Sequence, residues 1–245
     1  MAIFHDVESM SAEHQQLRLG LVTASRFDNV ITAKKRQLSS QAPGLMYRLL
    51  AERVSGEPLE IESMSPAPWM QRGLDYEDEA VRCYESLQQV ETARGGFFTD
   101  DAANIGCSPD RLVGDDGLLE IKCPLLPKQI ETAITGDLAD HVCQLQGQML
   151  VSGRLWTDVF SYHPRIILDP VRVMRDEDFI ADLDRALTVF VEEMLRRYDE
   201  LVQRFGPFPL PSSAIPPIQE IADGLGVSLQ DVDDLFAARR RERGE

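Results

Sequence analysis

Long hydrophobic runs are missing from this sequence. No stretch of its 245 residues approaches the roughly 18 to 20 apolar side chains needed to span a membrane. Residues 1–6 also lack the basic segment and apolar run of a secretory signal. We therefore expect a cytoplasmic protein with no membrane partner.

Cysteine is scarce as well, and the four residues present are far apart: Cys83, Cys107, Cys123 and Cys143. None belongs to a Cys-x-x-Cys motif, so the sequence predicts free and mostly buried thiols rather than disulfides. The same scatter argues against a four-cysteine iron–sulfur cluster, which some nucleases carry and which would colour the purified protein.

An excess of basic residues is the third absence. Asp and Glu number 41 against 25 Lys and Arg, which gives a formal net charge of −16. Such a charge ordinarily disfavours a polyanionic substrate. The distribution is uneven, however, because residues 1–60 hold seven basic and seven acidic side chains. The net charge therefore does not exclude a nucleic-acid substrate.

The spacing of apolar residues and the positions of Gly and Pro predict a mixture of helices and strands. Helices are expected over residues 11–18, from Thr23 onward, and over 43–55, 69–89, 127–135, 138–152 and 176–205. Strands are expected over residues 90–94, 96–99, 111–113, 118–123, 157–162 and 171–174. This order predicts an α/β (α+β) fold with one mixed central β-sheet flanked by helices.

The composition changes near the carboxyl end and predicts three parts. Residues 1–205 form the main domain. Residues 206–217 contain five prolines in twelve residues and are expected to form a semi-rigid linker. Residues 218–245 are expected to be a C-terminal helical appendage. Its spacing is typical of a helix-turn-helix, but Asp231, Asp233 and Asp234 would repel phosphates, so a packing or protein-binding role is favoured.

Two acidic residues and one lysine are predicted to share one face of a β-hairpin. Glu120 and Lys122 lie two residues apart on a strand and so point to the same side, whereas Ile121 points into the core. A two-residue loop at 115–116 would place Asp110 on the opposite face. A three-residue loop at 115–117, with Gly117 as its left-handed residue, pairs Asp110 with Lys122 and brings it to the Glu120 face. The sequence favours the second register.

This set of side chains has a chemical meaning. Two carboxylates are hard oxygen ligands that select Mg²⁺ or Mn²⁺ rather than zinc. A bound divalent ion acidifies water and stabilises the charge that develops at phosphorus. Lys122 could hold or deprotonate the attacking water, and it is one of only four lysines among the 25 basic residues. By spacing alone, an ordinary cross-strand charge pair is an equally good interpretation.

Five ordered blocks carry a resemblance to a known family. Pro109-Asp110 followed by Glu120-Ile121-Lys122 is the PD-(D/E)xK nuclease signature. The sequence resembles the lambda exonuclease / YqaJ-like viral recombinase nuclease family over about residues 10–205. The matching blocks are residues 17–25, 72–80, 107–110, 119–124 and 144–146. Arg111 departs from the family, which often has glycine at this position.

The resemblance implies a PD-(D/E)xK nuclease core and a role for each residue of the signature. Asp110 and Glu120 would be the metal ligands, with the carbonyl of Ile121 as a third. Mg²⁺ would be the cofactor, Mn²⁺ could replace it, and the family pattern implies two ions per site. Lys122 would position or activate water. Glu77 and Gln144 would assist, although Glu77 could equally lie on a solvated acidic face of its helix.

The resemblance also implies contacts with DNA. Arg18 would hold the 5′-phosphate of the end being digested, because a guanidinium forks around a phosphate and stays charged. Without the matching block, a surface ion pair would be the better interpretation of Arg18. Ser25 and Ser108 match serines near phosphate. The loop Lys34-Lys35-Arg36 suits the DNA backbone, with a solvated charge run as the alternative.

The function implied is a Mg²⁺-dependent, processive 5′-to-3′ exonuclease acting on double-stranded DNA ends with a 5′-phosphate. It would release nucleotides and leave a 3′ single strand for a single-strand annealing protein in phage-type recombination, in a bacterial cell and encoded by a phage or prophage. The family forms ring-shaped homotrimers, and a ring with an acidic exterior would reconcile DNA binding with the net charge. Two alternatives remain: a structure-specific or restriction-type PD-(D/E)xK endonuclease, and a non-catalytic DNA- or protein-binding module.

Overall fold

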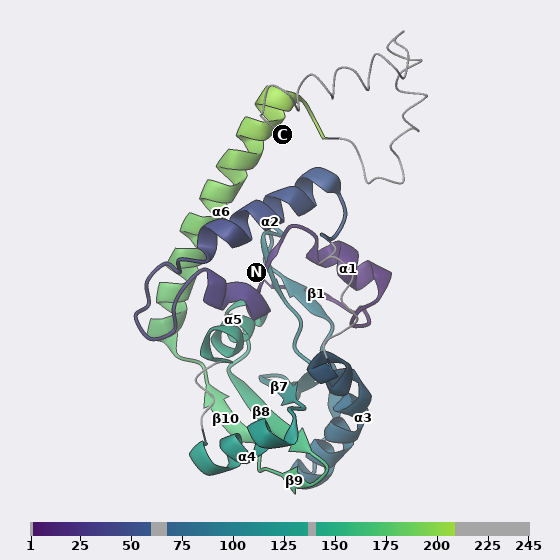
Figure 1. The fold of residues 1–245 in the computed structure, drawn as a ribbon. Helices are drawn as coiled ribbons and strands as arrows, with labels where there is room; N and C mark the ends of the chain where they lie inside the picture. The colour runs from purple at the N-terminus through teal and green to yellow at the C-terminus, as the bar shows by residue number, and fades with distance from the viewer. Residues whose placement is uncertain (1, 60–67, 137–140, 209–245) are drawn as a thin grey trace.

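The computed structural model describes residues 2–59, 68–136 and 141–208, and it forms an α/β fold with helices around two β-sheets (Figure 1). The predicted fold class is confirmed. The expectation of one central sheet is wrong, because the strands form two sheets, one of six strands and one of four. Most of the predicted linker at 206–217 and the whole appendage at 218–245 lie outside the described residues.

The larger sheet has the strand order β10-β8-β7-β6-β3, with β9 paired to β8. Only β7 and β8 run parallel, and the other pairs are antiparallel. The strands are β3 (Thr92–Arg94), β6 (Arg111–Val113), β7 (Gly117–Lys122), β8 (Trp156–His163), β9 (Ile166–Ile167) and β10 (Val171–Met174). The central strand β7 carries Glu120 and Lys122, and Asp110 immediately precedes its neighbour β6.

The smaller sheet has the order β1-β4-β5-β2, and only β2 and β5 are parallel. Its strands are β1 (Ile3–His5), β4 (Phe97–Thr99), β5 (Ile105–Cys107) and β2 (Val22–Thr23). The sequence predicted only β4 of these four. Strands of two or three residues are too short to show an alternating pattern, so long-range pairing decides whether they form.

Six of the seven helices predicted within residues 1–205 are present as α-helices. They are α1 (Ala12–Arg18), α2 (Ala42–Ser55), α3 (Pro68–Gln88), α4 (Leu126–Thr135), α5 (Val142–Ser152) and α6 (Glu177–Phe205). The helix expected from Thr23 is instead a short 3₁₀ helix, η1 (Ala24–Asn29), and the Thr23 side chain makes no capping hydrogen bond. Residues 137–140, which were expected to begin the fifth helix, lie outside the described residues.

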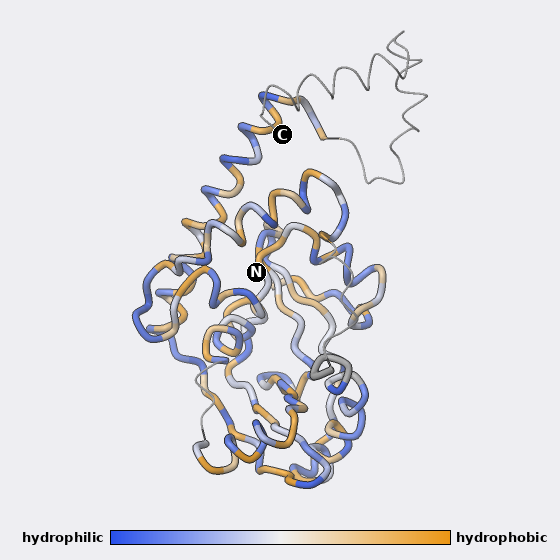
Figure 2. Tube along the Cα trace, viewed as in Figure 1, coloured by the Kyte–Doolittle hydropathy of each residue, from blue (hydrophilic) through white to orange (hydrophobic). Residues whose placement is uncertain are grey.

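Helix α5 packs closely against η1. A Cβ atom added at Gly147 would lie 2.3 Å from the ring of Phe27, so only glycine permits this approach. Helix α6 is amphipathic: its buried residues Phe179, Leu183, Leu187 and Phe190 recur at helical spacing, and Figure 2 shows orange and blue alternating along it. These contacts join α5, α6 and η1 in one apolar core.

A second apolar core lies between α3 and the larger sheet. It includes Ala80 and Tyr84 of α3, Leu119 and Ile121 of β7, and Phe160 of β8. Ile121 is buried, as its place in the strand predicted. None of the helices in the described part of the chain is both long and apolar enough to cross a membrane.

Candidate active site

The hairpin of β6 and β7 brings the two predicted carboxylates together. Arg111 pairs with Leu119 and Val113 with Gly117, and continuing this register by one residue sets Asp110 opposite Glu120. The three-residue loop is 114–116, with Gly114 left-handed at φ 55°, rather than the predicted 115–117. The expected pairing of Asp110 with Lys122 is therefore wrong. The predicted face is right, because the observed register differs from the predicted one by two residues, and side chains two residues apart on a strand point to the same face.

Glu120 is the centre of a hydrogen-bond cluster and is only 4% exposed. Its Oε1 accepts hydrogen bonds from Lys122 Nζ and from Gln144 Nε2, both at 2.6 Å. Its Oε2 accepts one from Gln148 Nε2 at 2.7 Å. Lys122 Nζ also lies 3.4 Å from Gln144 Oε1. Three donors from β7 and α5 thus fix the position of this carboxylate.

Asp110 is anchored by the backbone of the neighbouring strand. Its Oδ2 accepts a hydrogen bond of 2.6 Å from the Ile121 N–H. Burial raises the pKa of Asp110 well above its usual range, and the nearby charge of Glu120 raises it further. Burial alone would lower the pKa of Lys122, but the Glu120 carboxylate outweighs it and raises the pKa. The lysine is therefore an ammonium group at neutral pH.

The donor set suits a hard divalent cation. Two neighbouring buried carboxylates repel each other, and a cation between them would relieve this repulsion. Within the described ranges, no group of three or more His, Cys, Asp or Glu side chains forms a ready metal cluster. Mg²⁺ needs no such cluster, because it is commonly held by one or two carboxylates and keeps several waters. Asp110 and Glu120 therefore fit this ion, and the Ile121 carbonyl stays a predicted third ligand.

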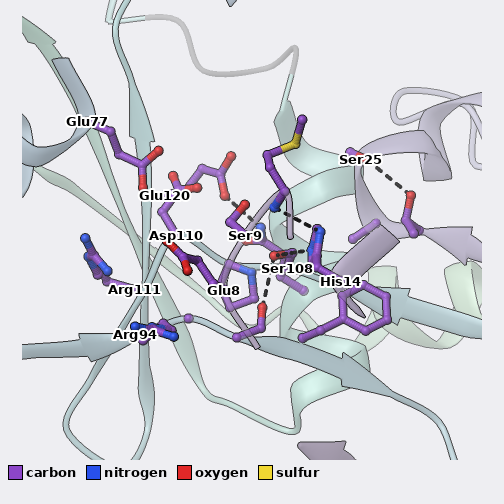
Figure 3. A pocket seen from close by; sticks show the side chains of 18 of the residues that line it. Glu8, Ser9, His14, Ser25, Glu77, Arg94, Ser108, Asp110, Arg111 and Glu120 are labelled. Carbon is purple, nitrogen blue, oxygen red and sulfur yellow. Dashed lines mark hydrogen bonds between the residues drawn. The ribbon is translucent and has the colours of Figure 1, made fainter. Parts of the chain in front are cut away.

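These carboxylates line a cavity of about 520 Å³ together with most of the other predicted site residues. Arg18 from α1, Ser25 from η1, Glu77 from α3 and Gln144 from α5 all line it. Ser108 lies in its wall near His14, as Figure 3 shows. Neither Lys122 nor Ile121 lines the cavity, and Lys122 reaches it through its contacts with Glu120 and Gln144.

Glu77 faces this cavity rather than only solvent. Burial raises the pKa of Glu77, and the guanidinium of Arg111 acts in the opposite direction. Figure 3 shows Glu77 beside Asp110 and Glu120. Asp78 also lines the cavity, but its side chain is 84% exposed, whereas Asp75 and Glu79 do not line it. Glu77 is therefore the half-buried carboxylate of this helix that lies beside the predicted metal ligands.

A hydrogen-bond chain connects α1 to the wall of the cavity. The Met10 N–H donates to His14 Nδ1 at 3.3 Å, and His14 Nε2 lies 3.2 Å from Ser108 Oγ. Ser108 in turn donates to the Gly96 carbonyl at 3.0 Å. This pattern requires neutral His14 with its hydrogen on Nε2. The Ser25 hydroxyl makes a local contact, at 3.3 Å from Thr23 Oγ1.

Arg18 lines two cavities, the one that holds the carboxylates and a second one beside it. The second cavity is smaller, about 180 Å³, and is also lined by Arg26, Arg48 and Glu52. The buried Glu52 accepts a hydrogen bond from the Gly20 N–H at 3.1 Å, and it lies 3.8 Å from Arg26 and 3.6 Å from Arg48. Burial lowers the pKa of Arg18, but an arginine remains charged at neutral pH.

The predicted basic loop is not part of either cavity. Lys34 and Lys35 do not line the cavities, and Lys35 is exposed. Arg36 pairs instead with α6: its Nη1 lies 3.1 Å from Asp182, and its guanidinium lies over the ring of Phe179. A DNA contact by this loop therefore stays a prediction for a surface outside the candidate active site.

Sequence reasoning missed two residues of the site, Gln148 and His14. Gln148 lies one helical turn after Gln144 on α5, so its spacing could have placed it on the same face. His14 lies four residues before Arg18 on α1 and could have been found in the same way. The four cysteines are free, as predicted, with Cys107 and Cys143 in one apolar core and Cys83 and Cys123 in the other.

The mixed sheet, with Asp110 opposite Glu120 and Lys122 beside Glu120, is the arrangement of a PD-(D/E)xK nuclease core, and it defines the class of protein. The model of the YqaJ-like viral recombinase domain matches residues 13–155, and the chain belongs to this family. No curated protein sequence matches the chain.

Among solved structures, the alkaline exonuclease LHK-Exo from Laribacter hongkongensis is 32% identical, with a TM-score of 0.69 over 79% of this chain and 97% of that one. The structure of LHK-Exo in complex with dAMP gives a TM-score of 0.70 with the same identity and coverage. A phage-related exonuclease from Haemophilus somnus 129PT is 14% identical, with a TM-score of 0.54 over 75% of this chain and 96% of that one, and it shares the fold. This chain is homologous to alkaline exonuclease.

Proposed function

We propose that this protein is a Mg²⁺-dependent exonuclease that digests double-stranded DNA from the 5′-end and releases nucleoside monophosphates. The observation that carries the proposal is that Asp110, Glu120 and Gln144 line one cavity with Arg18, while Lys122 contacts Glu120 and Gln144. Family membership and the homology to LHK-Exo, which has been solved with dAMP, support the same activity.

The chain's own residues divide the work of hydrolysis. Asp110, Glu120 and the Ile121 carbonyl would hold the ions. Bound Mg²⁺ would supply an acidified water and charge stabilisation at the phosphate. Gln144 and Gln148 keep Glu120 oriented through hydrogen bonds. Lys122, as an ammonium group, can orient the attacking water and offset the negative charge that develops on the phosphate.

We propose that Arg18 selects the 5′-phosphorylated end. Its guanidinium lines the same cavity as the metal ligands, with Ser25 and Ser108 nearby in the wall. Arg18 is half-buried, and a partly desolvated arginine binds a phosphate dianion more strongly than a fully exposed one, because the surrounding dielectric is lower. Processive digestion, a ring-shaped homotrimer and a single-strand annealing partner belong to the same proposal, and family resemblance alone supports them.

The first experiment digests linear blunt duplex DNA that carries a 5′-phosphate on one strand and a separate label on each strand. It is run with Mg²⁺, with a chelator, and beside a closed circular duplex. We expect Mg²⁺-dependent loss of the phosphorylated strand alone, with mononucleotide products and an intact circle. Replacing Arg18 with Gln should reduce the preference for the phosphorylated end, whereas Arg165→Gln, on the exposed turn after β8, should not.

Cutting of the circle would instead identify a PD-(D/E)xK endonuclease. Absence of cleavage with Mg²⁺ or Mn²⁺, accompanied by normal folding, would identify a non-catalytic binding module. Either result would contradict the proposed function.

A further inference from the structure

Two arginines face each other across the edge of the larger sheet. Arg94 in β3 pairs directly with Arg111 in β6, and both side chains line the 520 Å³ cavity. Figure 3 shows them on one side of Asp110, while His14 from α1 lies on the other. They therefore form a basic wall of the cavity that is separate from Arg18, which α1 supplies.

This pairing costs stability in the free protein. Like charges directly opposite each other on antiparallel strands repel. The counter-ion is weak, because Asp78 lies 3.8 Å from Arg111 and its side chain is 84% exposed. Arg94 has no ion pair with any residue in the described ranges, and Arg111 Nε is buried without a hydrogen-bond partner. Arg94 is exposed, so solvent screens part of this repulsion, but the described residues give the pair no strong anionic partner.

The backbone nevertheless holds the pair firmly in place. Gly95 follows Arg94, and a Cβ atom at this position would lie 1.7 Å from the Pro109 carbonyl oxygen. The close approach fixes the end of β3 against the residue that precedes Asp110. Arg94 is thus positioned beside the metal ligands by an approach that only glycine permits.

We propose that Arg94 and Arg111 bind a backbone phosphate of DNA, as a second phosphate site on the side of Asp110 away from α1. Guanidinium groups fork around phosphate oxygens, and two of them would compensate the carboxylates that DNA must approach. A bound phosphate would also relieve the repulsion between the two arginines. This proposal rests on the proposed function, since it assumes that DNA is the substrate.

The structure also offers Arg111 a smaller role, which is to offset the charge of Glu77. Arg111 lowers the pKa of Glu77. Arg94 lies one strand further out, on the edge strand β3, so its variant is the decisive one.

The test measures binding of a fluorescent linear duplex by anisotropy, with a chelator present so that nothing is cut. The variants are Arg94→Gln, Arg111→Gln and the double substitution, with Arg165→Gln as a control that removes the same charge elsewhere. We expect each single variant to weaken binding by about tenfold at moderate salt. Each arginine that no longer holds a phosphate should reduce the slope of log Kd against log salt by about one. Arg165→Gln should bind like the wild type.

Two further measurements separate a binding role from a structural one. The thermal midpoint of Arg94→Gln without DNA should be unchanged or raised, since one of two repelling charges is gone. Single neutral methylphosphonate linkages, placed in turn along each strand, should identify the phosphate. At the correct linkage the affinity of the wild type falls and that of the double variant stays the same. The strand that carries this linkage shows whether the arginines hold the digested or the complementary strand.

Wild-type binding by Arg94→Gln, or equal weakening by Arg165→Gln, would overturn the proposal. A lowered midpoint with unchanged DNA affinity would show that the arginines serve the fold alone. Because the assay requires no cleavage, its outcome is separate from the proposed function. A wild type that binds through the pair without cutting would contradict only the nuclease, and one that cuts without using the pair would contradict only this inference.

Discussion

Each oxygen of the Glu120 carboxylate has a partner that holds it in place. Lys122 and Gln144 donate to one oxygen and Gln148 to the other. A buried carboxylate with this many donors remains oriented before any metal arrives, which lowers the cost of organising the site. Lys122 is the only one of these donors that carries a charge, so its removal has the largest expected effect.

Replacing Lys122 with Ala should reduce DNA hydrolysis by about 10²- to 10⁴-fold, because the ammonium no longer orients water or offsets charge. The matched control is Lys128→Ala on α4, where the lysine is 52% exposed and lies 3.0 Å from Glu131. Single-turnover digestion and circular dichroism would be measured for both variants. Equal activity of the two folded variants would remove Lys122 from the mechanism.

His14 should make stability depend on pH. Burial, together with the charge of Arg18, lowers the pKa of His14 below its usual 6.5. The unfolded chain therefore binds the proton more readily than the folded one, and the stability contribution is complete above about pH 6.5 and declines as the pH falls below it. Protonation also removes the acceptor that the Met10 N–H uses.

The measurement for His14 is urea unfolding from pH 5 to 8, compared with His14→Gln. The wild type should lose stability toward pH 5 more steeply than the variant. Parallel curves for the two proteins would contradict this assignment.

At the scale of elements, the β6–β7 hairpin and the close packing of α5 position the side chains of the candidate active site. The β6–β7 hairpin sets Asp110 opposite Glu120, and α5 carries Gln144 and Gln148 one turn apart toward them. Helix α5 reaches this position because Gly147 lets it approach η1 closely. Gly95 has the same role for the end of β3, against Pro109.

Substitution of Gly95 with Ala should reduce the free energy of unfolding by about 1–3 kcal/mol, because the added methyl group must displace the Pro109 carbonyl. DNA hydrolysis should fall with it, since Asp110 follows Pro109. The control is Gly44→Ala in α2, where a Cβ atom meets nothing within 4 Å. This change should raise stability by about 0.5–1 kcal/mol. Chemical denaturation of both variants measures the difference, and a neutral Gly95→Ala would contradict the close approach.

At the scale of the whole molecule, the cavity lies where the two sheets, α1, α3 and α5 come together. The net charge of −16 does not prevent a basic contribution here, because Arg18, Arg94 and Arg111 all line this cavity. A bound cation would link Asp110, which precedes β6, to Glu120 in β7. Metal binding should therefore be visible in the stability of the complete fold.

Mg²⁺ should raise the free energy of unfolding by about 2.7 kcal/mol at a concentration of 100 times its Kd, because only the folded chain has the site. In Asp110→Asn this stabilisation should be largely absent. The metal-free variant should be at least as stable as the wild type, because one of two repelling carboxylates is gone. Calorimetry with Mg²⁺ and with a chelator tests both expectations. Equal stabilisation of the two proteins by Mg²⁺ would place the ion elsewhere.

The sequence by itself determined which side chains share a strand face and where the main helices lie. Both follow from local periodicity: Glu120 and Lys122 share a face at any register, and Phe179, Leu183 and Leu187 form one side of a helix wherever it packs. The tertiary structure decided what depends on distant pairing. It set the exact hairpin register, formed the short strands β1, β2 and β5, and joined Gln148 to Glu120. It also placed Arg94 opposite Arg111 and paired the Arg36 side chain with Asp182 of α6. Contacts between segments that are remote in the chain produce no local sequence pattern from which they could be predicted.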